Sequence, residues 1–153
     1  MNKHIKTQEI FKSQFVNEKL YSCQVIATIL AIENLMGENS NGISIYQKWI
    51  KSRGKRDIRE ATFSLVNLFL SIYSRGYDKN FPLEVNKDTL VMLGGAHRLG
   101  ICIYLNIESV YCNQVDNQRI HPKKYDIEYF SNILSKEELE IMVEKIKKLR
   151  GQK

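Results

Sequence analysis

The sequence is poor in the features that mark secreted and membrane-spanning chains. It has three cysteines and two prolines in 153 residues, and no apolar run reaches the roughly 18 to 20 residues that a membrane span needs. The nearest, Val25 to Leu35, is interrupted by Thr28, Glu33 and Asn34. The amino terminus has no apolar stretch followed by a small-residue cleavage site, which argues against export by a signal peptide. We therefore expect a cytoplasmic protein without a membrane span.

The few cysteines form no recognisable framework. Cys23, Cys102 and Cys112 are odd in number, unevenly spaced and surrounded by apolar residues. A disulfide scaffold pairs its cysteines, and a zinc site repeats its ligands at short spacings. The pattern predicts buried, reduced thiols, with no metal site and no catalytic cysteine.

The distribution of charge gives the first indication of function. Hydrophobic residues make up 43% and charged residues 26%, which is typical of one globular domain, and the formal net charge is +6. Six of the cations crowd into the stretch KWIKSRGKRDIRE, residues 48–60, opposed only by Asp57 and Glu60. Such a cluster suits phosphate on a nucleotide, on a metabolite or in nucleic acid, and it is equally consistent with a solvated basic loop.

Hydrophobic periodicity predicts an α+β fold. Helical spacing of apolar residues alternates with short stretches of β-forming residues, and Ser135 with Glu138 makes a capping box before a final apolar stripe. We predict helices at 6–20, 22–36, 44–52, 61–75, 97–105 and after Ser135, and strands at PLEVN, DTLVML and IESVYCNQV, the first two joined by a hairpin turn. The result is a single domain, 1–153, with a small mixed β-sheet and flanking helices. Its parts are a helical N-terminal extension (1–43), a core (44–116) and a helical C-terminal tail (117–153).

The stretch LGGAHRLGICIYL, residues 93–105, predicts a binding site. Two glycines end a strand and open a helix, so unpaired N–H groups and the positive end of the helix dipole are exposed at this corner. His97 and Arg98 add donors in the first turn, where cations are unfavourable unless an anion compensates them. The pattern favours an anion site formed by Gly94, Gly95, Ala96, His97 and Arg98. The alternative is a plain glycine turn, with His97 a hydrogen-bonding group of the core and Arg98 solvated.

The segment from Ser71 to Cys112 resembles the ParB/sulfiredoxin superfamily. Members share a helix ending in a Ser-Ile…Gly pattern, a Pro-hydrophobic-x-Val strand, a hairpin strand, a Gly-x-His-Arg or Gly-Glu-Arg-Arg corner, a helix and a closing strand. Here these features fall in the same order on 71–76, 82–85, 89–93, 95–98, 99–105 and 107–112. The resemblance implies a ParB/sulfiredoxin-like fold with a nucleotide or phosphate at the corner. It does not imply one activity, because the superfamily includes sulfinic acid reductases, free serine kinases, nucleotide-dependent chromosome-partitioning proteins and nuclease-like members.

Departures from the family pattern reduce the number of superfamily activities that this chain could have. Ala96 stands where sulfiredoxins have their attacking cysteine, which excludes that reaction. Gly94 stands at the position of an aspartate in the serine kinases, which weakens a direct transfer of their metal-binding arrangement. About forty residues follow the closing strand, and they end in a single capped helix. That tail disfavours DNA reading by the helix-turn-helix module of the partitioning proteins.

A more extensive resemblance is to small ParB-like proteins encoded among surface-polysaccharide genes. The matching positions are Tyr46, Trp49 and Arg53, then Gly76-Tyr77-Asp78, then Gly94 to Leu99, then Tyr125 to Leu139. This resemblance implies a nucleotide-using or phosphate-handling step on a small polar or glycan-linked substrate.

The residues and the resemblance together predict a kinase-like phosphotransferase. Its nucleotide, in the first instance ATP with Mg²⁺, would place its phosphates at the corner, where Arg53 and Arg56 would reach the same ligand. Its substrate would be a small polar metabolite or a surface-glycan precursor. The catalytic candidates are Asp78, Asp57, Glu60 and His97, although each acid is also typical of a surface or helix-start position. Two alternatives stay open: a nucleotide-sensing module without turnover, and a ParB-like nucleic-acid-binding protein or nuclease.

Overall fold

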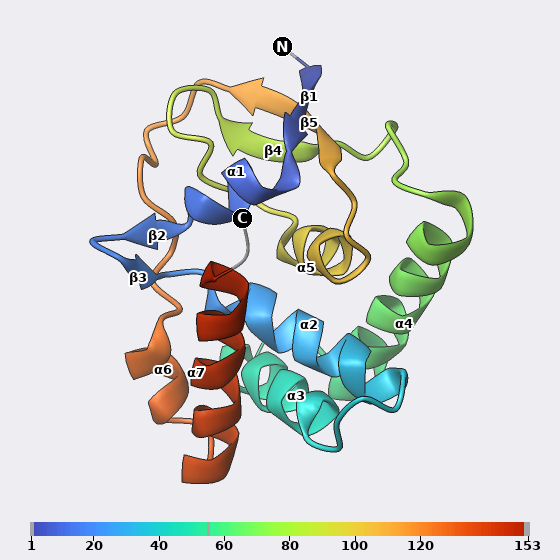
Figure 1. Ribbon diagram of the computed structural model, residues 1–153, viewed down its shortest axis with the longest axis vertical. Coiled ribbons are helices and arrows are strands. Elements are labelled where there is room, and N and C mark those ends of the chain that lie inside the picture. Colours follow the sequence, from blue (N-terminus) through green and yellow to red (C-terminus); the bar gives the residue numbers. More distant parts are fainter. Residues whose placement is uncertain (1, 55, 152–153) are drawn as a thin grey trace.

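The computed structural model describes residues 2–54 and 56–151 (Figure 1). In chain order the elements of these ranges are β1 (Asn2–Lys6), α1 (Thr7–Lys12), β2 (Phe15–Val16), β3 (Lys19–Leu20), α2 (Cys23–Leu35), α3 (Gly42–Arg53), α4 (Ile58–Arg75), β4 (Leu83–Asn86), α5 (Ala96–Tyr104), β5 (Ser109–Val115), α6 (Ile127–Ser131) and α7 (Lys136–Arg150). The sheet of β1, β5 and β4 lies at one end of the molecule, and α5, α2 and α3 follow below it in successive layers. The predicted α+β class is confirmed. Over the described ranges, every helix is too short or too polar to span a bilayer.

The sheet is mixed, as predicted. β5 lies between its two neighbours and pairs antiparallel with β1, where Ile5 is opposite Val110, and parallel with β4, where Leu83 is opposite Cys112. Parallel neighbours need a crossover connection, and α5 lies on that connection between β4 and β5. The helix that follows the glycine corner therefore belongs to the crossover between two paired strands, and it packs mainly on α2.

Most of the predicted helices are confirmed. The predictions 22–36, 44–52, 61–75 and 97–105 match α2, α3, α4 and α5 to within three residues at each end. The capping box of α7 is also present, because Ser135 Oγ accepts from the Glu138 N–H at 3.1 Å and Glu138 Oε1 accepts from the Ser135 N–H at 2.9 Å. Apolar periodicity and capping residues are local signals, and here they identify the elements correctly.

The prediction of one helix over 6–20 is wrong. α1 is short, a hairpin of β2 and β3 follows it, and residues 2–6 form a strand of the sheet. Asn17 and Glu18 have φ angles of 51° and 67°, as a two-residue hairpin turn requires. Gln14 is fully buried, and its Oε1 accepts a hydrogen bond from the Met92 N–H at 3.3 Å. The N-terminal extension is therefore not purely helical, because a long-range contact and a turn override the helical pattern.

The prediction of a strand at DTLVML is also wrong. Across this described segment, the pairing is reduced to a single bridge between Met92 and Val85. Leu90 has a φ of 63°, and the side chain of Asn86 accepts hydrogen bonds from two N–H groups of the turn, those of residues 88 and 89. The chain turns back beside β4, as the hairpin prediction requires, but this turn leaves too few residues in register for a strand.

α2 is the helix on which the neighbouring helices pack. A Cβ at Gly42, the first residue of α3, would collide with the carbonyl oxygen of Leu30 in α2. A Cβ at Gly100 in α5 would lie 2.9 Å from the side chain of Thr28, also in α2. Both contacts require a residue without a side chain, so α3 and α5 approach α2 more closely than larger residues allow.

Gly100→Ala is expected to destabilise the protein. Overpacking against Thr28 costs about 1–3 kcal/mol, and the better helix propensity of alanine offsets about 1 kcal/mol of that. Denaturant unfolding should therefore show a net loss of up to about 2 kcal/mol. Gly94→Ala is the matched control, because a Cβ there meets nothing within 4 Å. Equal stability of the two variants would contradict the close packing of α5 on α2.

Candidate anion-binding site

The glycine corner lies beside the start of β4. Leu93 donates its N–H to the carbonyl oxygen of Glu84 at 2.9 Å, so the chain runs back along β4 before α5 begins. Gly95 is the N-cap residue of α5 and has a φ of 93°, and a Cβ on it would collide with the side chain of Leu83. A glycine is required at this position, and it leaves the backbone of the corner open to a ligand.

α5 begins without an anionic or polar cap of its own. The first N–H groups of an α-helix have no partner inside the helix. In α5 no side chain of the described residues caps them, and the first turn contains no acid but carries His97 and Arg98. This end of the helix therefore presents several donors and a positive partial charge without a compensating group.

A cavity of about 210 Å³ opens at this corner. The corner itself forms one wall, and the other walls come from α2, α3 and the segment after β5. Its lining includes Gly94 to His97 of the corner, Gln24, Trp49, Arg53, Arg119, Lys123 and Tyr125. Three cations from two separate segments thus converge on the uncapped end of α5.

Two aromatic rings hold Arg53 in place. Its guanidinium carbon lies 5.2 Å from the ring centroid of Trp49 and 6.0 Å from that of Tyr125. The two rings are themselves in edge contact, with centroids 6.2 Å apart. Stacking of this kind restrains a long side chain, so Arg53 is prepared to meet a ligand with little loss of entropy.

Two buried side-chain atoms have no hydrogen-bond partner among the described residues, and both belong to residues that line this cavity. They are Nε1 of Trp49 and Oε1 of Gln24. Trp49 is only 2% exposed, and a buried donor left without a partner costs about 1–3 kcal/mol.

A second cavity, of about 250 Å³, lies on the other side of His97. It shares Gly95 and His97 with the first cavity and adds Arg56, Arg98 and Ser64. Arg56 donates from Nη2 to Ser64 Oγ at 3.1 Å, and the guanidinium of Arg98 lies 5.5 Å from the ring centroid of Phe81. Arg53 lines the first cavity and Arg56 the second, so the basic stretch lies beside the corner. That both arginines reach one ligand stays a prediction.

His97 separates the two cavities as a neutral side chain. Its Nε2 lies 2.9 Å from the hydroxyl of Tyr46, and its ring also contacts Trp49. Burial lowers the pKa of His97 to about 4, and the nearby charges of Arg56, Arg53 and Arg98 add to this effect. Burial likewise raises the pKa of Tyr46 to about 12, so the bond joins two uncharged groups. Such a pair can donate to a ligand or accept from it without adding to the positive charge.

The predicted catalytic acids are outside the lining of the two cavities, although Asp57 and Glu60 adjoin the lining residues Arg56 and Ala61 in the chain. Asp57 caps α4 by accepting from the Glu60 N–H at 3.1 Å, and Glu60 is exposed. Asp78 accepts from the Asn80 N–H at 2.9 Å in the turn before β4. None of the three acids is among the residues that line these cavities. Of the predicted catalytic residues, the structure brings only His97 to the corner.

Sequence reasoning missed the contribution of the segment after β5. The side chain of Asn86 is 2% exposed and donates to the carbonyl oxygens of Asn117 at 2.9 Å and Arg119 at 3.0 Å. These bonds hold the segment across the end of β4 and bring Arg119 and Lys123 to the cavity. No local pattern links these cations to a corner more than twenty residues earlier in the chain.

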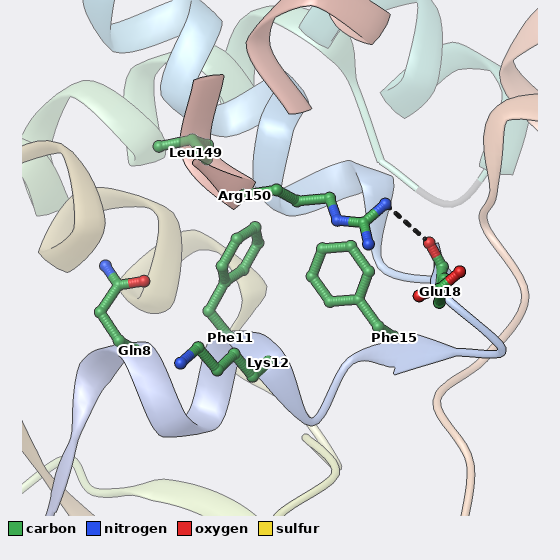
Figure 2. A pocket seen from close by; sticks show the side chains of 7 residues that line it. All are labelled: Gln8, Phe11, Lys12, Phe15, Glu18, Leu149 and Arg150. Carbon is green, nitrogen blue, oxygen red and sulfur yellow. Dashed lines mark hydrogen bonds between the residues drawn. The ribbon is translucent and has the colours of Figure 1, made fainter. Parts of the chain in front are cut away.

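A third cavity, of about 340 Å³, lies between α1, β2 and the end of α7 (Figure 2). Its walls include the rings of Phe11 and Phe15, and Arg150 lies over Phe15 with a distance of 5.2 Å to the ring centroid. Arg150 also donates from Nη1 to the carbonyl oxygen of Glu18 at 3.0 Å. The arginine is thus already paired within the chain, unlike the unsatisfied groups at the corner.

The cysteines are all buried and free, as the sequence predicts. Burial raises the pKa of Cys23 and Cys102 to about 12 and that of Cys112 to about 11. Over the described residues, no group of three or more His, Cys, Asp or Glu side chains is arranged to hold a metal ion. Comparison of the chain with protein-family models, with curated proteins and with solved structures finds no match.

The neutral His97 predicts a loss of stability in acid. The unfolded chain has a histidine pKa near 6.5 and binds a proton that the folded chain excludes down to about pH 4. The contribution of His97 to the free energy of unfolding is complete above pH 6.5. It falls by on the order of 3 kcal/mol as the pH drops toward 4. Denaturant unfolding between pH 4 and pH 7 measures this loss. His97→Gln should flatten the slope of the free energy of unfolding against pH. Exposed His121 is the control: if His121→Gln flattens the slope equally, the assignment is wrong.

Proposed function

We propose that this protein binds the phosphate groups of a small molecule at the N-terminus of α5. The observation that carries the proposal is the indole N–H of Trp49, which is buried without a partner among the described residues in a side chain that lines the cavity at that helix end. A single unpaired donor in an apolar wall would be a defect. Beside uncapped backbone N–H groups and an arginine, it completes a set of donors that all suit one anion.

The charge of the site supports an anion with more than one negative charge. Arg53, Arg119 and Lys123 line the first cavity, and Arg56 and Arg98 line the second. No Asp or Glu is among the described residues that line either one. A phosphate dianion or a pyrophosphate would offset this accumulation of cations, whereas a single carboxylate would leave most of it uncompensated.

The resemblance to the ParB/sulfiredoxin superfamily supports a nucleotide as the source of these phosphates. The order of α4, β4, the corner, α5 and β5 agrees with the family order, although the hairpin strand is reduced to one bridge. Both cavities are smaller than the roughly 300–1,000 Å³ of sites that enclose a drug-sized ligand, so the base would lie outside them. The same proposal makes the chain a divergent ParB-like domain. It also places the protein in the cytoplasm, because three free thiols favour a reducing compartment.

Phosphoryl transfer is the second candidate function. Two cavities that share Gly95 and His97 could hold a nucleotide on one side and a small polar metabolite or glycan precursor on the other. Such reactions depend mainly on positioning and on neutralising charge. Mg²⁺ would enter bound to the nucleotide, and one of the acids Asp57, Glu60 or Asp78 would have to approach the corner to act on the acceptor.

Calorimetric titration with ADP, ATP, CTP and pyrophosphate tests the proposal. Removing one charged hydrogen bond in Arg53→Gln or Arg98→Gln is expected to weaken binding by about ten- to a hundredfold. Trp49→Phe keeps the ring and removes only the N–H, and should weaken binding by about three- to tenfold. Arg75→Gln, at the end of α4, is the matched control and should leave affinity unchanged. Equal affinities in the wild type and all three site variants would overturn the placement.

Further assays on the wild type and the same variants distinguish phosphoryl transfer, nucleotide sensing and nucleic-acid binding. Release of labelled phosphate from ATP would favour transfer, and binding without release would favour a nucleotide-sensing module. A nucleic-acid protein predicts instead that DNA or RNA binds tightly at low salt and weakly at physiological salt. If Arg53→Gln loses only nucleic-acid binding and keeps the nucleotide, the proposal fails.

A further inference from the structure

We propose that the outer face of α4 is a dimer interface, on which α4 of a second copy of this chain packs in the antiparallel direction. The proposal rests on the side chains that this helix exposes and on the charges at its two ends. It concerns a surface and a partner, and it does not depend on the phosphate site.

α4 buries one face and leaves the other uncovered. Its buried residues recur at helical spacing and face the core: Ala61, Leu65, Phe69 and Ile72. Figure 1 shows the helix at the edge of the molecule, where α3 and α5 are the helices that it contacts most. The face turned away from the core is therefore open to a partner.

This open face carries an apolar stripe. Phe63, Leu70 and Tyr73 are 68%, 53% and 61% exposed. Val66, one turn after Phe63, is half-buried. Spacings of three, four and three residues place these four side chains along one side of the helix, as in the seam of a coiled coil. Single exposed apolar side chains are ordinary, but a contiguous patch of them is typical of an interaction surface.

The order of side chains in the stripe fits a second copy of the same helix. An aromatic residue lies at each end and an aliphatic residue at each inner position, so the order of types is the same in either direction. In a two-fold dimer one patch meets an identical patch. An antiparallel arrangement centred on the stripe places Phe63 opposite Tyr73 of the second copy. It places Val66 opposite Leu70, so aromatic side chains meet aromatic ones and aliphatic side chains meet aliphatic ones.

Opposite charges at the two ends of the stripe favour the same arrangement. Arg59 lies one turn before Phe63 on the same side of α4, and Asp78 follows the end of the helix. Within the described part of the chain neither side chain forms an ion pair, and the carboxylate of Asp78 accepts from the Asn80 N–H. Antiparallel packing brings Arg59 opposite residue 77 of the second copy, beside Asp78 and the negative end of α4. By symmetry each dimer contains this contact twice.

The area of the stripe indicates a weak dimer. An aromatic side chain buries about 150–250 Å², so two largely exposed rings and two aliphatic side chains offer on the order of 400 Å² per copy. A standard interface buries about 800 Å² per partner. The stripe would supply the apolar centre of such an interface, and we expect a dissociation constant in the micromolar range.

Sedimentation equilibrium over a series of concentrations, up to about 1 mM, tests the interface. The wild-type protein should form dimers reversibly. Leu70→Glu places a charge at the centre of the stripe and should weaken the dimer by about a hundredfold. Ile120→Glu is the matched control, because Ile120 is 57% exposed but lies outside α4, and it should leave the dimer unchanged.

Exchange of the two end charges tests the direction of packing. Arg59→Glu alone and Asp78→Arg alone each place like charges opposite one another twice, so each should weaken self-association by about three- to tenfold. An equal mixture of these two variants should form heterodimers as tight as the wild-type dimer, because both contacts then join opposite charges. In a parallel dimer each end would meet itself, and the single variants would associate as tightly as the wild type.

Three results would overturn the proposal. The first is a wild-type protein that stays monomeric up to about 1 mM. The second is a dimer that Leu70→Glu leaves intact, and the third is undiminished association of Arg59→Glu and Asp78→Arg. A monomer that binds vesicles of phosphatidylglycerol and phosphatidylcholine, and loses this binding in Leu70→Glu, would assign the face to a lipid surface instead.

Discussion

Close contact between helices through glycine is the constraint on which the candidate site depends. α3 meets α2 at Gly42, and α5 meets α2 at Gly100, where in each case a side chain would collide with α2. α3 carries Trp49 and Arg53, and α5 carries His97. Because both helices are fixed to the same buried helix, these side chains meet at one corner with little freedom to separate. Rigid elements hold a binding site more accurately than loops do.

The corner gathers groups that are unfavourable in the free protein. Burial and three nearby arginines lower the pKa of His97, the indole N–H of Trp49 has no partner among the described residues, and the first turn of α5 lacks a side-chain cap. Each feature costs stability by itself, and a single anion would relieve the unpaired donors and the crowded cations together. Proteins commonly hold destabilising arrangements where a ligand binds, and this cluster follows that pattern.

The sequence predicted the parts of the fold that local signals determine. The nearly continuous apolar residues of α2, the apolar stripes of α4 and α7 and the capping box of Ser135 and Glu138 identified helices correctly. The N-terminal hairpin was missed, because its turn depends on positive φ at Asn17 and Glu18 and its position on the contact from Gln14 to residue 92. Long-range contacts of this kind leave no periodic trace in the chain.

The candidate site, like the fold, could be predicted only in the parts that local signals determine. The glycine corner could be read from two glycines before a helix, since backbone freedom is a local property. The proposed role of Trp49 as a donor could not be predicted from the sequence. A tryptophan at helical spacing looks like a core residue until its N–H is found without a partner. Arg119 and Lys123 reach the cavity only through the hydrogen bonds of Asn86 to a distant segment.

The chain contains one tryptophan, so its indole N–H gives a single signal in a ¹⁵N–¹H spectrum. Titration of pyrophosphate while this signal is followed is the most direct test of the phosphate site. If pyrophosphate binds at this corner, the indole signal shifts saturably to lower field, together with the backbone N–H signals of Gly95, Ala96 and His97. An indole signal that stays in place at saturating pyrophosphate would contradict the phosphate site.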